Sequence, residues 1–486
     1  MIDLNKKPTL FNYLYDSLRD LIITGRLPYG SKMPSISEIC LLYNIGIRTV
    51  KDVLKKLKED GYIKTHERKA SIVIYQPDQL NNQRQGIYFL QHRNEMIEVY
   101  KTINIVLPLF ISFAVDVLTD DDLYKWINLL KQSQNKNILI REKIFSHMLY
   151  DILEKSYNPL LRSIFSSLEI YAQPIYFLNY EANIQYIQLE KKFKNIDWVV
   201  ESFITKDKVE IDYRFHLMFE TVIQGIDKVL NSLTSQYPDI LESKPQFHWF
   251  AQLGRNHYYT SIARDIIDKI CLGIYPEESF LPAEAKLAQS YCVSVSTIRK
   301  SLRMINELGF GQTMNVKGTK VFIQNNHDAI KCLKNKQYRQ DTLLYLNAMQ
   351  VMIILIEKAA LLAFPYIDNQ DIQQLQNEMT NPNKFFLESL LDCILAHLPL
   401  LPLQQIIQEI NQIIYWGYYF SFYPTEKRNI NIVTIKSHNA FDYLCDHNAI
   451  LFAKEISSSY KHALNVVRDY LIDFGLTEAK HIITPN

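Results

Sequence analysis

The 486-residue sequence lacks the residue patterns that build disulfide frameworks, metal sites or common catalytic centres. Its six cysteines are scattered, with no Cys-x-x-Cys pair and no histidine at ligand spacing, which argues against a disulfide scaffold or a zinc site. It has no Gly-rich phosphate loop, no His-Glu-x-x-His motif and no nucleophile elbow. These absences favour a reduced, cytoplasmic protein that is not an enzyme.

A large excess of one charge and a long apolar run are also missing. The net charge is only +1, so any surface for a nucleic acid must be local. The first residues do not have the apolar stretch of a secretory signal. Of the two most apolar runs, 103–115 is short and contains Pro108, and 351–364 is broken by Glu357 and Lys358. We therefore expect two buried core helices and no membrane span.

What the sequence does contain is one module that occurs twice. Segment 17–63 aligns with segment 262–311 almost without gaps, so that Gly61, for example, pairs with Gly309. Each copy has the order helix, turn, short helix, tight turn, longer helix and two β-rich runs, which is typical of a winged helix-turn-helix. The longer helix is expected to bury Ile47, Val50, Leu54 and Leu57 in the first copy, and Val295, Ile298, Leu302 and Ile305 in the second.

Local signals mark the ends of these elements. Ser294 is expected to cap the second longer helix by accepting a hydrogen bond from the backbone N–H of Thr297. Gly61 and Gly309 fall where a helix ends in a left-handed residue. The runs 62–75 and 310–323 are predicted to form β-hairpins, the wings of the two modules.

Cations lie opposite the apolar stripe of each longer helix and at the predicted hairpin tips. Residues 1–76 hold 13 Lys/Arg against 8 Asp/Glu, and residues 255–324 hold 9 against 6, while the remainder of the chain is acidic. A lysine-rich helix face is often merely solvated, but its duplication with turn and wing favours a polyanionic partner, double-stranded DNA. The expected contact residues are Arg48, Thr49, Lys51, Lys55, Arg68 and Lys69 in the first copy, and Ser294, Ser296, Thr297, Arg299, Arg303, Lys317 and Gly318 in the second.

Both modules resemble the DNA-binding domain of GntR-family bacterial transcription regulators. The second copy keeps "LPAEAKLA", "VSVSTIRKSL", "ELGF" and "KGTKV", and the first keeps "GRLPYGSKMPS" and "RTVKDVLKKLKEDGYI". The resemblance implies a winged-helix fold and a role in transcription regulation. The chain departs from the family pattern at three positions. The family's phosphate-binding Arg is Ser37 in the first copy and Ala285 in the second. In the first copy alone, the helix-start Ser is Gly46 and the wing Gly is Ala70. The two modules are therefore expected to differ in affinity and in sequence preference.

The segments after the modules have helical periodicity and few strand signals, and they resemble the all-helical effector domain (the FCD type) of one GntR subfamily. That subfamily often binds a metal through one Asp and three His. The resemblance places two of those positions on Ser146 and Tyr150 in the first segment, and on Leu387 and Leu391 in the second. One histidine remains in each, and we expect no metal and no cofactor. A possible small-molecule effector pocket would involve Tyr150, His216 and His438.

The sequence thus predicts a mainly α protein of two winged helix-turn-helix domains, each followed by a helical bundle. The expected boundaries are 1–76, 83–245, 255–324 and 330–486. The expected function is a regulator in which one chain supplies both halves of a dimer-like DNA reader with strict half-site spacing, although a homodimer remains open. The alternative is a non-catalytic interaction or scaffold protein whose DNA surfaces have partly decayed.

Overall fold

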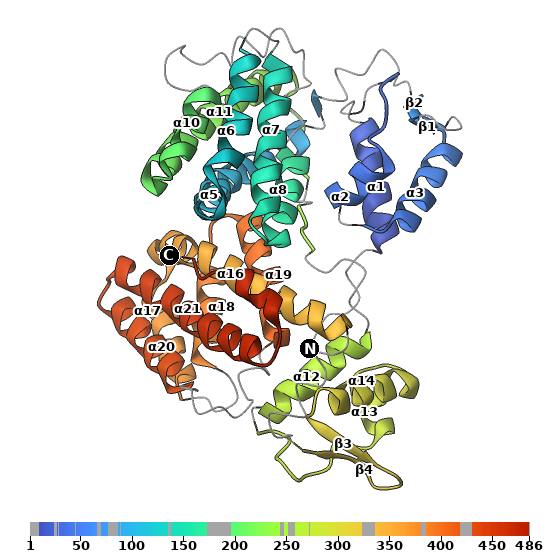
Figure 1. Ribbon diagram of the computed structural model, residues 1–486, viewed down its shortest axis with the longest axis vertical. Helices are drawn as coiled ribbons and strands as arrows, with labels where there is room; N and C mark the ends of the chain where they lie inside the picture. The colour runs from blue at the N-terminus through green and yellow to red at the C-terminus, as the bar shows by residue number, and fades with distance from the viewer. Residues whose placement is uncertain are drawn as a thin grey trace. The chain divides into compact units, whose positions relative to one another are not determined.

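The computed structural model describes residues 9–485 except for 24–26, 28, 44, 66–69, 76–85, 88, 135–137, 173–195, 244–246, 251–257, 272, 323–335, 381–384 and 418–429. The chain divides into two compact units, the first made of Met1–Leu253 with Leu400–Pro402 and the second of Gly254–Pro399 with Leu403–Asn486. Each unit contains a three-helix module with a strand pair, followed by a set of longer helices (Figure 1). The mainly α fold class expected from the sequence is therefore confirmed.

Each module has the element order of a winged helix-turn-helix. In the first unit, α1 (Leu10–Ile23), α2 (Ile36–Tyr43) and α3 (Ile47–Glu59) precede β1 (Ile63–Lys64) and β2 (Ile72–Val73). In the second, α12 (Tyr258–Cys271), α13 (Glu284–Ser290) and α14 (Val295–Glu307) precede β3 (Gly311–Met314) and β4 (Gly318–Val321). Both strand pairs are antiparallel, which confirms the two predicted hairpins.

The duplication extends to individual hydrogen bonds, at positions 248 residues apart. Gly30 N–H donates to Val73 O in the first module, and Glu278 N–H donates to Val321 O in the second. The isolated bridge of Lys32 with Ile72 recurs as that of Phe280 with Lys320. Gly61 and Gly309 both have positive φ, 79° and 81°, so each ends its helix in the left-handed conformation as expected. The two modules are copies of one backbone.

The core of each module lies between its first and third helices, with one correction to the predicted stripe. In α3 the buried residues are Val50, Val53, Leu54 and Leu57, and Ile47 is 59% exposed. Ile47 was wrongly expected to be buried, because it is the first residue of α3 and precedes the turn that packs on α1. In α14 the expected Ile298, Leu302 and Ile305 are buried, and Val295 is half-buried at the same helix start.

The helices of the first unit form a bundle around α5 (Arg93–Val117). This helix packs on α11 (Lys208–Gln236), α8 (Pro159–Ala172) and α7 (Ile138–Lys155), with α6 (Asp120–Gln132) and α10 (Ile196–Thr205) completing the bundle. Pro108 lies inside α5 and is buried.

The second unit builds a similar bundle around α16 (Lys336–Ala363). Its main partner is α21 (Ala449–Asp473), which also packs on α20 (Ile430–Cys445); α18 (Phe386–Ala396) contacts both α16 and α20, and α17 (Asn369–Glu378) lies on α18. The chain also forms α19 (Leu401–Gly417) and two short 3-10 helices, Phe364–Tyr366 and Thr477–His481.

Helices α5 and α16 contain the two apolar runs noted in the sequence. By length and composition alone, Arg93–Val117 and Tyr338–Tyr366 could cross a membrane, yet 67% and 61% of their most apolar windows are buried inside the fold. Core helices of water-soluble bundles have this property, because neighbouring helices cover them on most sides. Their burial agrees with the expected role as core helices.

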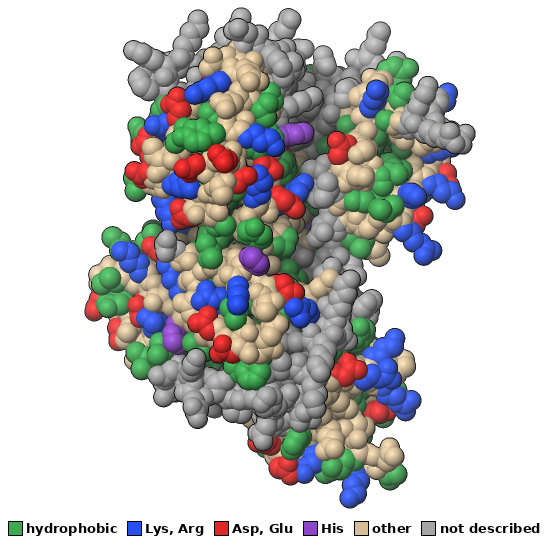
Figure 2. All heavy atoms as spheres, viewed as in Figure 1, with side chains coloured by type: hydrophobic (Ala, Val, Ile, Leu, Met, Phe, Trp, Pro, Cys, Tyr) green, Lys and Arg blue, Asp and Glu red, His purple; other side chains and the backbone are tan. Residues whose placement is uncertain are grey.

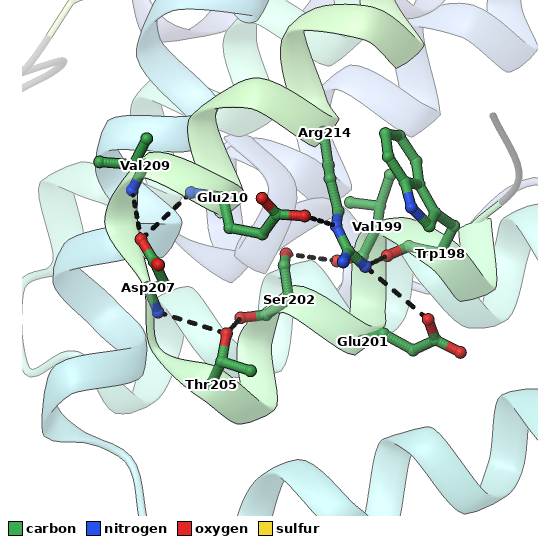
Figure 3. A network of polar contacts seen from close by, with 9 residues as sticks. All are labelled: Trp198, Val199, Glu201, Ser202, Thr205, Asp207, Val209, Glu210 and Arg214. Atoms are coloured by element: carbon green, nitrogen blue, oxygen red, sulfur yellow. Dashed lines mark hydrogen bonds and ion pairs between the residues drawn. The ribbon is translucent and has the colours of Figure 1, made fainter. Parts of the chain in front are cut away.

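The corner between α10 and α11 illustrates how polar side chains fix the bundle (Figure 3). Asp207 caps α11 by accepting hydrogen bonds from the backbone N–H groups of Val209 (2.9 Å) and Glu210 (3.2 Å). One turn further along, Arg214 pairs with Glu210 at 2.6 Å and lies over the Trp198 ring, 4.9 Å from its centroid. The contact between Arg214 and Trp198 holds the first turn of α10 against α11.

Candidate nucleic-acid interface

The start of α14 is a cluster of hydroxyl groups held by its N-cap. Ser294 Oγ accepts a hydrogen bond from Thr297 N–H at 3.2 Å, which confirms the predicted cap. The same oxygen lies 2.8 Å from Ser296 Oγ and 2.9 Å from Thr297 Oγ1. Ser294 and Ser296 are exposed, so short polar side chains stand at the open end of this helix.

The start of α3 is built differently, because Gly46 occupies the N-cap and provides no side-chain bond. Here the exposed residues are long cations: Arg48, Lys51 and Lys55 are exposed, and Thr49 is half-buried. Lys51 and Lys55 are one helical turn apart and so share a face. Figure 2 shows Lys and Arg side chains gathered on the module that contains α3. At the helix start, the first module therefore has Gly46 and Arg48 where the second has Ser294 and Ser296.

Acidic side chains pair with some of the cations in each module. Lys55 lies 3.9 Å from Glu59, a long ion pair with a highly exposed lysine. Within the described part of the chain, no ion pair joins Arg48 or Lys51 to an acid. In the second module, by contrast, Arg299 Nε pairs with Glu284 Oε2 of α13 at 2.8 Å, while Arg303 is exposed one turn later.

The wing of the second module presents its tip to solvent. Gly318 begins β4 with a φ of 98°, and a Cβ at this position would meet no atom within 4 Å, so backbone conformation rather than space calls for glycine. Val316 is fully exposed and has a φ of 71°, which is unusual for a β-branched residue. Lys317 is exposed beside it. In the first wing, the expected contact residues Arg68 and Lys69 lie outside the described residues.

The longer helix of each module, α3 or α14, is its recognition helix. Polar side chains of α1 and α3 hold the recognition helix of the first module in place. Tyr15 of α1 donates a hydrogen bond to Asp60 at 2.5 Å, and Lys56 Nζ pairs with the other oxygen of Asp60 at 2.8 Å. Lys56 and Tyr15 hold the pKa of Asp60 below its usual value, and burial together with Asp60 raises the pKa of Tyr15 to about 12. Lys56 thus serves the fold, unlike its neighbour Lys55.

The helix before each recognition helix is fixed by a different device in each module. In the first, Ser35 and Glu38 form a reciprocal capping box at the start of α2, which lowers the pKa of Glu38. In the second, the Tyr291 hydroxyl donates to Asp265 of α12, and Lys269 pairs with Asp265 at 2.7 Å. Burial and Asp265 raise the pKa of Tyr291 far above its usual value. The first device caps the start of α2, and the second holds the turn between α13 and α14 against α12.

The residues proposed for an effector pocket have separate sets of partners. Tyr150 of α7 is half-buried and donates a hydrogen bond to Glu169 of α8, which also accepts one from Ser146 at 3.0 Å. His216 of α11 lies 3.0 Å from Asn104 of α5, and His438 of α20 lies against Phe386. Burial raises the pKa values of both Glu169 and Tyr150. Among the described residues, no cluster of three or more His, Cys, Asp or Glu side chains could hold a metal ion.

The fold and the exposed cations on α3 and α14 define both modules as winged helix-turn-helix domains of the DNA-binding kind. Two segments of the chain, 11–73 and 258–321, match the family model "Bacterial regulatory proteins, gntR family". These two modules are GntR-family domains, as the sequence motifs predicted. Comparison with curated proteins gives no match.

Solved structures with similarity to this chain include three regulators. A Streptococcus agalactiae GntR protein is 14% identical with a TM-score of 0.22, over 43% of this chain and 99% of that one. E. coli McbR/YncC is 15% identical with a TM-score of 0.22, over 48% and 100% of the chains. A transcriptional regulator (GntR family member) from Pseudomonas syringae pv. tomato str. DC3000 is 15% identical with a TM-score of 0.24, over 48% and 92%.

Sequence reasoning missed Glu284 as a site residue. It lies within the quoted "LPAEAKLA" motif, but its partner Arg299 is 15 positions further along the chain. The alignment of the two copies does contain a signal, because the residues equivalent to Glu284 and Arg299 are Ile36 and Lys51 in the first module. An acid next to a recognition-helix arginine in only one copy is a visible signal.

Proposed function

We propose that this chain is a cytoplasmic transcription regulator that binds double-stranded DNA with both of its winged-helix modules. The observation that carries the proposal is the recurrence of one backbone, hydrogen bond by hydrogen bond, with exposed cations on the recognition helix of each copy. Side chains at a helix start can reach base edges, while cations along its exposed face neutralise phosphates. We assign domains to residues 1–76, 83–245, 255–324 and 330–486.

In this proposal the two modules have different tasks. The first has Arg48, Lys51 and Lys55 at its recognition helix and supplies most of the sequence-independent affinity. The second has the hydroxyl cluster of Ser294, Ser296 and Thr297 together with Arg299, and supplies more of the base discrimination. One chain then acts as a pseudo-dimer on an imperfect palindrome. A homodimer with four modules would use the same contacts.

We also propose that the helical bundles make DNA binding responsive to a small molecule, without a metal or cofactor. The polar group of Ser146, Tyr150 and Glu169 supports a site in the first bundle, because half-buried polar side chains within an apolar bundle can orient a ligand. Resemblance to the effector domain places metal ligands at Ser146 and Tyr150, and neither is a typical metal ligand. For an enzymatic function, the sequence offers no Gly-rich phosphate loop, His-Glu-x-x-His motif or nucleophile elbow.

A scaffold protein with decayed DNA surfaces is the second candidate. Ser37 and Ala285, both exposed, stand at the phosphate-binding position that the family gives to arginine, and this observation favours it. Binding of the full chain to a random-sequence duplex, measured as a function of salt, separates the two. A regulator shows log affinity falling linearly with log salt, by about 0.9 units for each phosphate contacted. A flat line, or no binding at low salt, would contradict the proposed function.

A further inference from the structure

The ion pair between Arg299 and Glu284 is placed where a recognition helix would face DNA, and only the second module has it. Arg299 is the fifth residue of α14, and Glu284 is the first residue of α13. The Arg299 side chain is 66% exposed and that of Glu284 is 37% exposed. An ion pair with this much exposure contributes little to folding stability. Its placement therefore calls for another explanation.

The geometry of the pair leaves one end of the guanidinium free. Arg299 uses Nε–H to contact Glu284 Oε2 at 2.8 Å. Within the described residues, neither Nη atom of Arg299 has a hydrogen-bond partner. These two nitrogens form the planar fork that matches the O6 and N7 acceptors of guanine in the major groove. Glu284 thus accepts the hydrogen bond of Nε, the guanidinium nitrogen that does not take part in the contact with guanine.

Holding the fork in one orientation changes what an arginine does on DNA. A free, flexible cation gains affinity from any nearby phosphate, whereas a fixed planar fork can bind a base edge at a smaller loss of side-chain freedom. The Glu284 carboxylate also repels phosphates close to the arginine, which lowers binding at wrong sites. In the first module, Ile36 and Lys51 occupy the equivalent positions and can do neither.

We propose that Glu284 is a positioning residue that orients Arg299 to read a guanine, and that it makes the second module the sequence-selective one. This inference rests on the proposed DNA-binding function, because it assigns the base preference of that same interface.

The test is selection of duplexes from a randomised pool by the full chain, followed by affinity measurements on the selected duplex with each base at the guanine position. We expect the wild-type chain to select duplexes with a guanine at one position. The Arg299→Ala variant should show no preference for guanine at that position. Glu284→Ala should reduce the preference for guanine over other bases by about tenfold while leaving binding to random-sequence duplex equal or tighter. Glu284→Gln retains an oxygen that can accept from Nε and should restore the preference.

The first module provides a matched control. Lys51→Arg places an arginine at the equivalent helix position without an acid beside it. We expect this variant to gain affinity for every duplex and no guanine preference. An equal guanine preference in Lys51→Arg, unchanged selectivity in Glu284→Ala, or a Glu284→Gln variant as unselective as Glu284→Ala would each overturn the assignment. If the wild-type chain binds no duplex at any salt concentration, the proposed function itself fails.

Discussion

The double variant Lys51→Ala with Lys55→Ala should weaken the salt dependence of DNA binding. Both side chains are exposed on one face of α3, and Lys55, with 76% of its side chain exposed, is held only by a long ion pair with Glu59. Each phosphate neutralised by a lysine contributes about 0.9 units to the slope of log affinity against log salt. Losing two contacts should therefore reduce the slope by about 1.8 units.

This slope converts into a measurable difference in affinity. Raising the salt from roughly 50 to roughly 200 mM should cost the wild type about tenfold more affinity than it costs the double variant. Fluorescence anisotropy of a labelled random-sequence duplex across this range gives the slope directly. Because neither lysine is buried, the free energy of unfolding of the variant should stay within about 0.5 kcal/mol of the wild-type value.

Lys56→Ala is the matched control for this prediction. It removes the same charge from the same helix, but Lys56 is bonded to Asp60 at 2.8 Å, and Asp60 also accepts from Tyr15. We expect Lys56→Ala to lower stability slightly and to leave the slope unchanged. If Lys56→Ala changes the slope as much as either of the other lysines does, the effect is one of total charge. The assigned face of α3 would then be wrong.

Three further outcomes follow from the structure. Ser294→Ala should destabilise the start of α14 by about 1 kcal/mol and speed hydrogen exchange at the Thr297 amide, and unchanged exchange would refute the cap. Burial raises the pKa of Glu169 above its usual 4.5, so its contribution to stability is full below that value and is lost as the pH rises through the folded-state pKa. Glu169→Gln should therefore gain thermal stability over wild type near neutral pH and lose that advantage in acid. Chelator treatment should leave melting temperature and DNA binding unchanged, because a bound metal would add directly to folding free energy.

Features set by the local sequence could be predicted. The Ser294 cap, the left-handed Gly61 and Gly309, and the two hairpins depend on a few neighbouring residues, so their residue types were sufficient. The burial of Ile47 was mispredicted because helical periodicity does not show where the covering helix ends. Periodicity places a residue on a face, and only packing decides whether that end of the face is covered.

The alignment of the first helices shows a related limit. Matching "RD" at Arg19 with "RD" at Arg264 requires a shift of three residues relative to the rest of the module. The structure instead keeps the 248-residue spacing, with Leu18 and Ile266 buried at equivalent positions. A shift of three residues is close to one helical turn of 3.6 residues. The apolar faces of α1 and α12 therefore coincide in both alignments. Sequence alone could not choose between the two registers.

Side-chain pairs between distant segments were beyond prediction. Tyr15 and Asp60 are 45 residues apart, and Tyr291 and Asp265 are 26 apart, so their contacts depend on how helices pack. The sequence therefore predicted which residues would contact DNA, while the structure shows which of those cations already pair with an acidic side chain. Lys55 and Lys56, adjacent in sequence, differ in the length of their ion pairs, 3.9 Å and 2.8 Å.

The central claim is that both GntR-family modules of the chain bind the same duplex, and hydroxyl-radical footprinting on a selected duplex tests it most directly. The wild-type chain should protect two separate regions of the DNA. The variant Arg48→Ala/Lys51→Ala/Lys55→Ala should lose one region, and Arg299→Ala/Arg303→Ala should lose the other. A single protected region that survives either set of substitutions would contradict the claim.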